Sequence, residues 1–383
     1  MTERLHYADT FLFGFDANVV AHGTIGDRPS IVLDRSAFYP ESGGQMADRG
    51  TLGGRAILDV QVDDAGVVHH VIEGDLEIGA PVRGEIDASR RRLFASLHTA
   101  QHVLSRALVD VARADTVSSR LGETLATIDV KEILTDARVA ECEAIANRLV
   151  DDDVAVRAWF PSAEELASLA MRRAPKQSEN IRVVDISGFD VSPCGGTHVA
   201  RSAQIGLVRV VSTEKYKGGT RLSFHSGARA RTMLFGEDDA LRVLARALIC
   251  PIDGVPAGVE RLRAELASAK DDAGRLRSAL AVRIADDAKR SGDARVVVVL
   301  EDGGVELAQK VASELAEGSR VAIVAMKSSE GTHLVVARGP ASTENAGAIV
   351  KAITAAAGGK GGGRPERAEG RIPAGADVLT AIG

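Results

Sequence analysis

Two pairs of residues in this chain have the types and the spacing of metal ligands. The first pair is His98 and His102, in the segment HTAQH, and the second is Cys194 and His198, in the segment PCGGTH. Side chains four residues apart on a helix project from one face, so the two imidazoles can reach the same ion. A cysteine and a histidine at the ends of a glycine loop can close on that ion from a second segment. Together the four side chains predict a zinc site.

The combination is more specific than either pair alone. A histidine pair at helical spacing is common by chance, and a buried histidine more often forms a hydrogen bond than binds an ion. A second pair in a proline-glycine loop makes coincidence a poor explanation. Imidazole nitrogens with one thiolate suit Zn²⁺ better than Mg²⁺ or Ca²⁺. The remaining histidines have no such pairing and are interpreted as structural or exposed: His6, His22, His69, His70, His225 and His333.

Hydrophobic periodicity predicts the elements that hold these ligands. Short β-prone runs separated by turn residues fill residues 1–89, which is typical of a small β-barrel domain. Apolar residues then recur at helical spacing from 90 to 112, which places both histidines of HTAQH on a helix. Residues 124–130 alternate as a strand, and residues 139–150 follow a helical pattern. We therefore predict an α+β zinc-containing domain over residues 90–235.

A helical spacer is predicted over residues 236–292. Its apolar residues from Val259 to Leu280 alternate between spacings of three and four, with charged residues between them, as in a coiled-coil seam. Gly274 weakens the pattern. It is equally compatible with a homodimer, formed through residues 259–280 and the C-terminal domain, and with a helix packed within its own chain.

Residues 293–383 predict a separate α/β domain. Its last long predicted helix is followed by a run with five glycines in the six residues 358–363. Beside Lys360 and Arg364, these glycines would let backbone N–H groups and cations meet a phosphate. A flexible linker is the alternative, although a further apolar segment after the run favours binding.

Charge and composition limit the classes of function. The net charge of -6 argues against indiscriminate nucleic-acid binding. Between Arg201 and Arg231, however, seven basic residues accompany a single acid, Glu214, which predicts a phosphate-facing surface; a solvated strand edge protected by charge is the alternative. Three scattered cysteines and the absence of a charged-then-apolar leader lead us to expect the cytoplasm. The apolar runs are far shorter than the ~20 residues that span a bilayer, so no membrane segment is expected.

HTAQH with CGGTH resembles the editing domain of alanyl-tRNA synthetases and of the free-standing AlaX editing proteins. Three further segments agree with this resemblance and occur in the family's order. Residues 38–45, FYPESGGQ, are similar to the signature of a small barrel that precedes that domain, and residues 214–221, EKYKGGTR, to the strand and turn after the CGGTH loop. Residues 358–370 resemble the glycine-rich stretch of the C-terminal domain shared with DHH phosphoesterases. The chain therefore looks similar to a long-form AlaX protein.

The resemblance implies a zinc-dependent hydrolase that removes serine, or glycine as a second candidate, from misacylated tRNA(Ala). Because the sequence begins directly at the barrel, it implies trans-editing after release from the synthetase. The expected catalytic group is a zinc-bound water, with no protein residue assigned. Four protein ligands would close the metal site. Three alternatives therefore stay open: one ligand is displaced, the metal expands its shell, or zinc mainly positions the substrate.

Selection of serine over alanine implies a polar group that pairs with the serine hydroxyl. Thr116, Ser118 and Thr127, in or near the strand after the histidine helix, are candidates, and so is Gln101 within HTAQH. The residues expected to contact tRNA are Lys215, Lys217, Arg221, Lys360 and Arg364.

Two other functions remain as alternatives. A non-catalytic zinc-containing tRNA-binding module would bind tRNA and leave the ester intact. A phosphoesterase related to the C-terminal domain is disfavoured, because the aspartate-histidine-histidine motif of those enzymes is absent and His333 is the one histidine of that domain.

Overall fold

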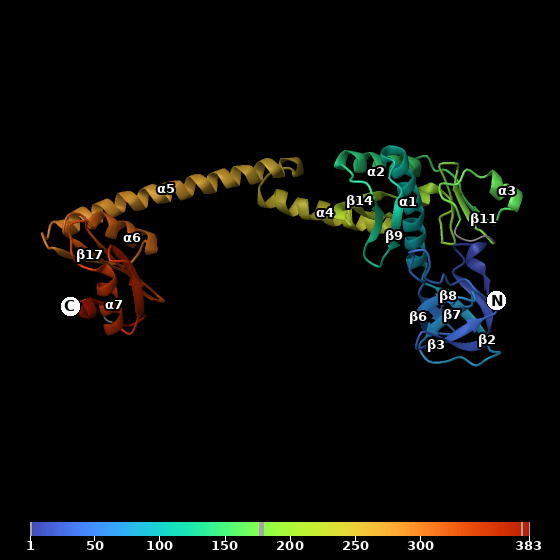
Figure 1. The fold of residues 1–383 in the computed structure, drawn as a ribbon, viewed down its shortest axis with the longest axis horizontal. Coiled ribbons are helices and arrows are strands. Elements are labelled where there is room, and N and C mark those ends of the chain that lie inside the picture. The colour runs from blue at the N-terminus through green and yellow to red at the C-terminus, as the bar shows by residue number, and fades with distance from the viewer. Residues whose placement is uncertain (1, 176–179, 377, 383) are drawn as a thin grey trace. The chain divides into compact units, whose positions relative to one another are not determined.

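The computed structural model describes residues 2–175, 180–376 and 378–382 (Figure 1). The chain divides into two compact units, Met1–Ala240 and Leu241–Gly383. Both contain helices and β-sheets, so the mixed helix-and-sheet, multi-sheet class predicted from the sequence is confirmed. Among the described residues, no helix combines the length and the apolar character needed to cross a membrane.

The first unit begins with a closed barrel of antiparallel strands in the order β2-β3-β7-β6-β5-β8. Alternate residues point inward and form an apolar core that includes Phe15, Leu33 and Val60. A short helical turn, η1 (Leu5–Tyr7), and the parallel pair β1 (Glu3–Arg4) and β4 (Arg35–Ser36) lie outside the barrel. The barrel strands are β2 (Gly14–Ile25), β3 (Arg28–Leu33), β5 (Gly50–Leu52), β6 (Arg55–Val62), β7 (Val68–Ile72) and β8 (Pro81–Ile86).

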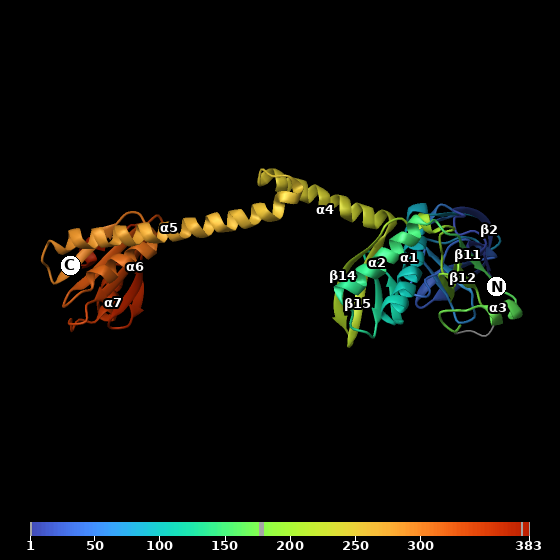
Figure 2. The ribbon, with the colours of Figure 1, turned by 90° about the horizontal axis from the view of Figure 1, so that it is seen from above.

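Helix α1 (Ala88–Ala112) follows the barrel and starts at Asp87, whose side chain accepts hydrogen bonds from the backbone N–H groups of Ser89 and Arg90. With α2 (Asp136–Asp151), it packs on one face of a four-stranded antiparallel sheet in the order β14-β15-β10-β9 (Figures 1 and 2). These strands are β9 (Thr116–Leu121), β10 (Ala126–Val130), β14 (Val208–Tyr216) and β15 (Gly219–Ser226).

The first unit also contains a second, smaller sheet with three strands. It contains β11 (Val156–Trp159), β12 (Val183–Ile186) and β13 (Asp190–Pro193), all antiparallel. Helix α3 (Ala163–Ser168) follows β11, and the turn η2 (Ser202–Ile205) precedes β14. Cys194 is the first residue after β13, so the sheet fixes where the CGGTH loop begins.

A fully buried ion pair joins the barrel to α1. The Nε of Arg91 lies 3.1 Å from Oδ2 of Asp48, and both side chains are shielded from solvent. The guanidinium also donates to the carbonyls of Thr10 and Ala37, while Asp48 accepts from the backbone N–H of Tyr39 at 2.7 Å. Because both charges are paired and hydrogen-bonded, removing one partner would leave the other buried and uncompensated.

The second unit is a five-stranded sheet in the order β16-β17-β18-β20-β19, with helices on both faces. Even-numbered residues of β17 face α6 and the end of α5, and odd-numbered residues face α7. The sequence pattern predicts strands at 296–300, 321–326 and 333–337 and helices at 305–316 and 345–357, and the structure confirms these elements within a few residues. Their bounds are β16 (Arg295–Leu300), α6 (Gly304–Leu315), β17 (Val321–Ser328), β18 (Gly331–Arg338), α7 (Ala346–Ala356), β19 (Lys360–Gly363), β20 (Arg367–Pro373) and α8 (Val378–Ile382).

The predicted spacer is helical, as α4 (Gly227–Ala247), the turn η3 (Ile252–Gly254) and the long α5 (Val255–Lys289). Only the end of α5 packs on α6, through Ala281 and Ala285. Five large residues of the predicted seam are exposed in the single chain: Val259, Leu262, Leu266, Leu276 and Leu280. The coiled-coil dimer and the alternative of packing within the chain both stay predictions.

The glycine run at residues 358–363 lies mostly in a strand, and phosphate binding by it stays a prediction. Most of the run forms the edge strand β19, paired with β20. A Cβ on Gly361 would lie 2.4 Å from Val350 of α7 and 2.7 Å from the Cα of Gly370. Glycine is thus required because strand and helix approach closely, which the sequence does not distinguish from a ligand-binding turn.

We expect the substitution Asp48→Ala to lower the free energy of unfolding by about 3–5 kcal/mol, because it leaves the Arg91 guanidinium buried without a counter-charge. Asp16→Ala, which breaks the exposed pair with Arg83, should cost less than about 1 kcal/mol. Urea unfolding of the full chain, followed by circular dichroism, measures both. Equal losses for the two variants would contradict the structural role assigned to the buried pair.

Candidate metal centre and adjoining pocket

The four predicted ligands come together in the first unit. His98 and His102 lie on one face of α1, and Cys194 and His198 lie on the loop that follows β13. One ligand atom from each residue lies within 4.8 Å of those of the other three. The histidines are buried, and Cys194 is half-buried. We refer to these four residues as the metal cluster.

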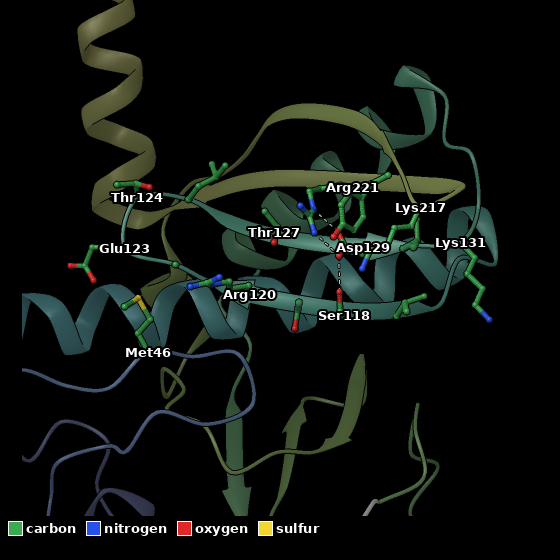
Figure 3. A pocket seen from close by; sticks show the side chains of 16 residues that line it. Met46, Ser118, Arg120, Glu123, Thr124, Thr127, Asp129, Lys131, Lys217 and Arg221 are labelled. Carbon is green, nitrogen blue, oxygen red and sulfur yellow. Dashed lines mark hydrogen bonds and ion pairs between the residues drawn. The ribbon is translucent and has the colours of Figure 1, made fainter. Parts of the chain in front are cut away.

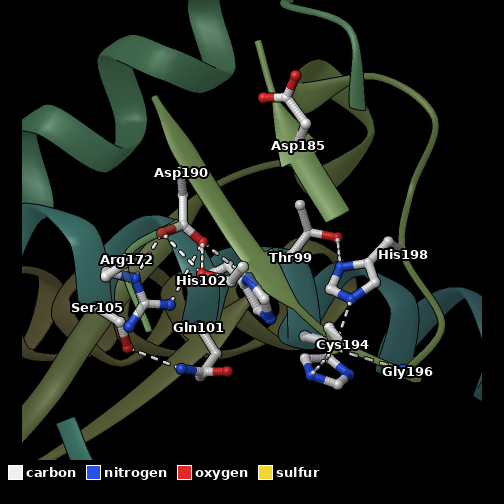
Figure 4. Close-up of polar contacts among 12 residues, drawn as sticks. Thr99, Gln101, His102, Ser105, Arg172, Asp185, Asp190, Cys194, Gly196 and His198 are labelled. Atoms are coloured by element: carbon white, nitrogen blue, oxygen red, sulfur yellow. Dashed lines mark hydrogen bonds and ion pairs between the residues drawn. The ribbon is translucent and has the colours of Figure 1, made fainter. Parts of the chain in front are cut away.

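Each histidine of the metal cluster has its Nδ1 hydrogen-bonded away from the cluster centre. The Nδ1 of His98 lies 2.7 Å from Oε1 of Gln45, and that of His102 lies 2.9 Å from Oδ2 of Asp190. The Nδ1 of His198 lies 3.1 Å from the hydroxyl of Thr99 (Figure 4). All three partners can accept a hydrogen bond, so each ring can carry its hydrogen on Nδ1 and keep Nε2 free for a metal.

The remaining ring nitrogens converge on the thiol. The Sγ of Cys194 lies 3.4 Å from Nε2 of His98 and 3.3 Å from Nε2 of His198. The Thr99 hydroxyl donates to the carbonyl of Ala95, so it accepts the hydrogen bond from His198 rather than donating it. This donor set of three imidazoles and one thiol fits Zn²⁺.

The pKa shifts of Cys194 and His198 favour the protonation states that bind a metal ion. Burial raises the pKa of Cys194, but His98, His198 and His102 together hold it well below its ordinary value. Burial lowers the pKa of His198 to about 3, despite the opposing effect of Cys194. A thiolate and a neutral imidazole are the forms that bind a metal.

The pKa of His102 is shifted in the opposite direction to that of His198, and a carboxylate, Asp190, is hydrogen-bonded to His102. Burial lowers its pKa, but Cys194 and Asp190 outweigh burial and raise the pKa to about 9. Burial would raise the pKa of Asp190, yet hydrogen bonds from His102 and Arg172 hold it far below its usual range. A metal ion entering the cluster would therefore displace a proton from His102.

Gln45 connects three parts of the site, and it belongs to the FYPESGGQ segment. Its Oε1 accepts from His98 and, at 3.2 Å, from the backbone N–H of Thr197, while its Nε2 donates to the Thr197 hydroxyl at 2.8 Å. The turn before it needs glycine, because Gly44 has a φ of +88° and its Cβ would lie 2.4 Å from the carbonyl of Ser119. The segment thus positions His98 from outside residues 90–235, the domain predicted to hold the metal.

A pocket of about 300 Å³ opens beside Cys194. Tyr7 and Phe160 form an aromatic wall, with ring centroids 5.4 Å apart. Arg182 lies over the Tyr7 ring, at 5.1 Å from its centroid, and donates to the carbonyls of Cys194 and Gly196. Arg173 completes the lining and donates to the carbonyl of Thr116 at 2.8 Å. We refer to this space as the Cys194 pocket.

Two of the predicted substrate contacts lie on the α1 side of the sheet. The amide of Gln101 donates to the hydroxyl of Ser105 at 2.7 Å, and the hydroxyl of Thr116 donates to the same oxygen at 2.7 Å. Ser118 and Thr127 lie on the opposite, outer face, where Ser118 donates to Asp129 at 2.6 Å. The structure therefore brings Gln101 and Thr116 together and separates Ser118 and Thr127 from them.

A β-bulge causes this separation. Asp129 pairs with Ser118, but its neighbour Val130 pairs with Thr116, so Val117 is an extra residue in β9. In a regular strand, residues two apart share a face, and Thr116 and Ser118 would point the same way. The bulge directs them to opposite faces of the sheet.

The predicted tRNA contacts lie in both units of the chain. Lys217 and Arg221 line a pocket on the outer face of the four-stranded sheet, whereas exposed Lys215 does not. In the second unit, Lys360 lines one pocket and Arg364 another. Each of these contacts stays a prediction.

Several residues around the metal cluster were not singled out from the sequence: Gln45, Thr99, Arg172, Arg182 and Asp190. The sequence points to Asp190 only as a carboxylate in the strand that ends just before Cys194. It points to Gln45 only as the last residue of the FYPESGGQ segment. No sequence signal identifies the partner of each histidine, because those partners are 53 and 88 residues away for His98 and His102.

Comparison with known families identifies two segments. The family described as threonyl and alanyl tRNA synthetase second additional domain matches residues 181–223, which include the CGGTH loop. The family described as tRNA synthetases class II (A) matches residues 6–90, which include the barrel. The chain thus contains segments related to class II tRNA synthetases.

Similar proteins narrow the class of relatives to alanine–tRNA ligases. An alanine–tRNA ligase of Halorubrum lacusprofundi is 34% identical over 97% of this chain and 42% of its own length. Those of Thermococcus kodakarensis and Halobacterium salinarum are 32% and 33% identical, over 97% and 99% of this chain and 42% and 44% of their own lengths. The resemblance to alanyl-tRNA synthetases predicted from the motifs is confirmed, and it supports a tRNA-related function. The chain spans less than half the length of these relatives.

One solved structure also matches. The C-Ala domain from Aquifex aeolicus alanyl-tRNA synthetase aligns with 23% of this chain and 84% of its own length, at 20% identity. The TM-score of 0.22 is too low to support a conclusion about the second unit.

We expect Gly196→Ala to abolish stoichiometric zinc binding, because the new Cβ would lie 2.1 Å from the His98 ring. Gly195→Ala is the matched control, since its Cβ would meet only the Tyr7 hydroxyl at 3.6 Å. Metal analysis of purified protein should find about one zinc per chain in the wild type and the control. Full zinc content in Gly196→Ala would show that the metal cluster is not the binding site.

Proposed function

We propose that this chain hydrolyses the ester bond of misacylated tRNA(Ala), releasing serine and, as a second substrate, glycine. The observation that carries the proposal is the metal cluster beside the Cys194 pocket, in a chain related to alanine–tRNA ligases over nearly its whole length. The match to the second additional domain of threonyl and alanyl tRNA synthetases supports the same proposal. The zinc ion and the misacylated form of the tRNA are parts of it.

The residues that would hold zinc are His98, His102, Cys194 and His198, and zinc there would supply Lewis-acid polarisation of the ester carbonyl. The protein's own groups orient the substrate. The Tyr7 ring and Phe160 would offer an apolar wall for the terminal adenosine, and Arg182, which lines the same pocket, would stabilise negative charge on the ester oxygen. An aminoacyl ester is labile, so good positioning supplies much of the required rate.

Selection of serine would depend on the polar chain of Gln101, Ser105 and Thr116. These three buried side chains are linked by hydrogen bonds on the α1 side of the sheet. A serine hydroxyl could join them, whereas alanine would leave one of them without a partner. A site built around such a hydrogen bond rejects the analogue that lacks the hydroxyl.

A non-catalytic tRNA-binding module remains a second candidate. Four protein ligand atoms within 4.8 Å of one another could fill the tetrahedral positions of a zinc ion, as in structural sites. Against this, Cys194 is half-buried and borders a pocket, which a purely structural site does not require.

Deacylation of labelled Ser-tRNA(Ala) and Ala-tRNA(Ala) tests the proposal. We expect rapid loss of serine, with alanine spared, and a drop of at least about 100-fold for Cys194→Ala because the metal cluster is incomplete. Cys250→Ala, at a half-buried cysteine outside the metal cluster, should retain both zinc and activity. Stable Ser-tRNA(Ala) in the presence of zinc-loaded protein that binds the tRNA would favour the binding module.

Thr116→Val should lower kcat/KM for Ser-tRNA(Ala) about tenfold without slowing the basal loss of alanine, because only serine uses the hydroxyl. Thr213→Val, at an exposed threonine of β14, provides the matched control. Single-turnover assays with both substrates measure the ratio. Equal effects of Thr116→Val on serine and alanine would remove the hydroxyl from substrate selection.

A further inference from the structure

A second pocket of the first unit, of about 920 Å³, lies on the outer face of the four-stranded sheet (Figure 3). Strands β9 and β10 and the turn between β14 and β15 line it. Because Ala126, Ile128 and Val130 pack in the core with α1, alternation directs Thr127 and Asp129 to the outer face. The sheet therefore separates this outer pocket from the metal cluster.

The outer pocket has an excess of positive charge. Its two carboxylates are already neutralised, because Arg221 donates to Asp129 at 2.7 and 2.9 Å and Arg90 donates to Glu123 at 2.7 and 2.8 Å. Three exposed cations also line the pocket, and in the described part of the chain none of them pairs with a carboxylate: Arg120, Lys131 and Lys217.

The arrangement of these cations suits an extended polyanion. The Nζ of Lys217 lies 5.1 Å from the centroid of the Tyr216 ring, and the Arg221 guanidinium lies 3.5 Å from it. These contacts fix the positions of Lys217 and Arg221 on one wall of the pocket. Arg120 lies near the end of β9, beside the turn to β10, and Lys131 directly follows the other end of β10. Cations spread along an open pocket match the spaced phosphates of a nucleic-acid strand better than one small ion.

The edge strand β9 connects the outer pocket with the catalytic side. Its bulge places Thr116 on the α1 side and Ser118 on the outer face, and Val117 between them is exposed. The carbonyl of Thr116 accepts from Arg173, which lines the Cys194 pocket, whereas Ser118 lines the outer pocket. A nucleic-acid strand that crosses the sheet edge at Val117 would thus touch both the outer pocket and the Cys194 pocket.

We propose that the outer pocket binds the phosphodiester backbone of the single-stranded 3′ end of tRNA, just before its terminal nucleotide. The terminal nucleotide then crosses the edge of β9 toward the Cys194 pocket. This inference rests on the proposed function and adds the surface that holds its substrate: Arg120, Lys131 and Lys217 contact phosphates, and the metal cluster faces the ester.

Binding of uncharged tRNA(Ala) to the zinc-loaded full chain tests the inference without requiring hydrolysis. Arg120→Glu and Lys131→Glu should each weaken binding about threefold to tenfold and reduce the slope of log affinity against log salt by about one. Arg138→Glu is the matched control, because Arg138 is an exposed cation on α2, in the helical layer on the other face of the sheet. Its affinity and salt slope should equal those of the wild type.

The same titrations with tRNA(Ala) lacking its single-stranded 3′ end locate the contact. Wild type, Arg120→Glu and Lys131→Glu should bind this shortened RNA alike. An undiminished penalty on the shortened RNA, or wild-type affinity of both variants for the full RNA, would overturn the inference. If the variants behave as expected but the wild type leaves Ser-tRNA(Ala) intact, the outer pocket stands and the proposed function fails.

Discussion

The side chain of Gln45 is the contact on which the geometry of the site depends. Its amide holds the Nδ1 of His98 and both the backbone and the hydroxyl of Thr197, so one residue of the barrel sets the distance between α1 and the CGGTH loop. The barrel can supply this contact because the buried pair of Arg91 and Asp48 anchors it to the first turns of α1. The barrel domain, which contributes none of the four residues of the metal cluster, thus helps to position His98 and the CGGTH loop.

Hydrophobic periodicity predicts the helices and strands better than it predicts which residues of different elements contact one another. The helix over 90–112 and the strands of the second unit follow from apolar spacing, because those patterns report one buried face. The four residues of the metal cluster follow from residue type and spacing. The partners of the ligands do not, because a hydrogen bond between residues 53 or 88 positions apart depends on tertiary packing. The structural reason for Gly361 in the run 358–363 is hidden for a related reason, since the close contact with α7 that requires glycine there is also tertiary.

The bulge in β9 shows how one extra residue changes a functional assignment. Thr116 and Ser118 were grouped as substrate contacts because both lie just after the histidine helix. The extra residue Val117 sends Thr116 toward Ser105 and α1 and Ser118 toward Asp129 and the outer face. Bulges occur often at sheet edges beside functional sites, where they redirect a side chain. Here the bulge lets a single edge strand serve two pockets of different chemistry.

The two pockets divide the electrostatic work. Around the metal cluster, burial keeps His198 neutral, the three histidines hold the pKa of Cys194 low, and Cys194 and Asp190 raise the pKa of His102. On the outer face, the cations are exposed and their effect is weakened by salt, so they can guide and hold an RNA strand without fixing it permanently. The residues of the metal cluster are largely buried, whereas Arg120, Lys131 and Lys217 of the outer pocket are exposed. The two groups of charges therefore differ in their access to solvent, and they lie on opposite faces of one sheet.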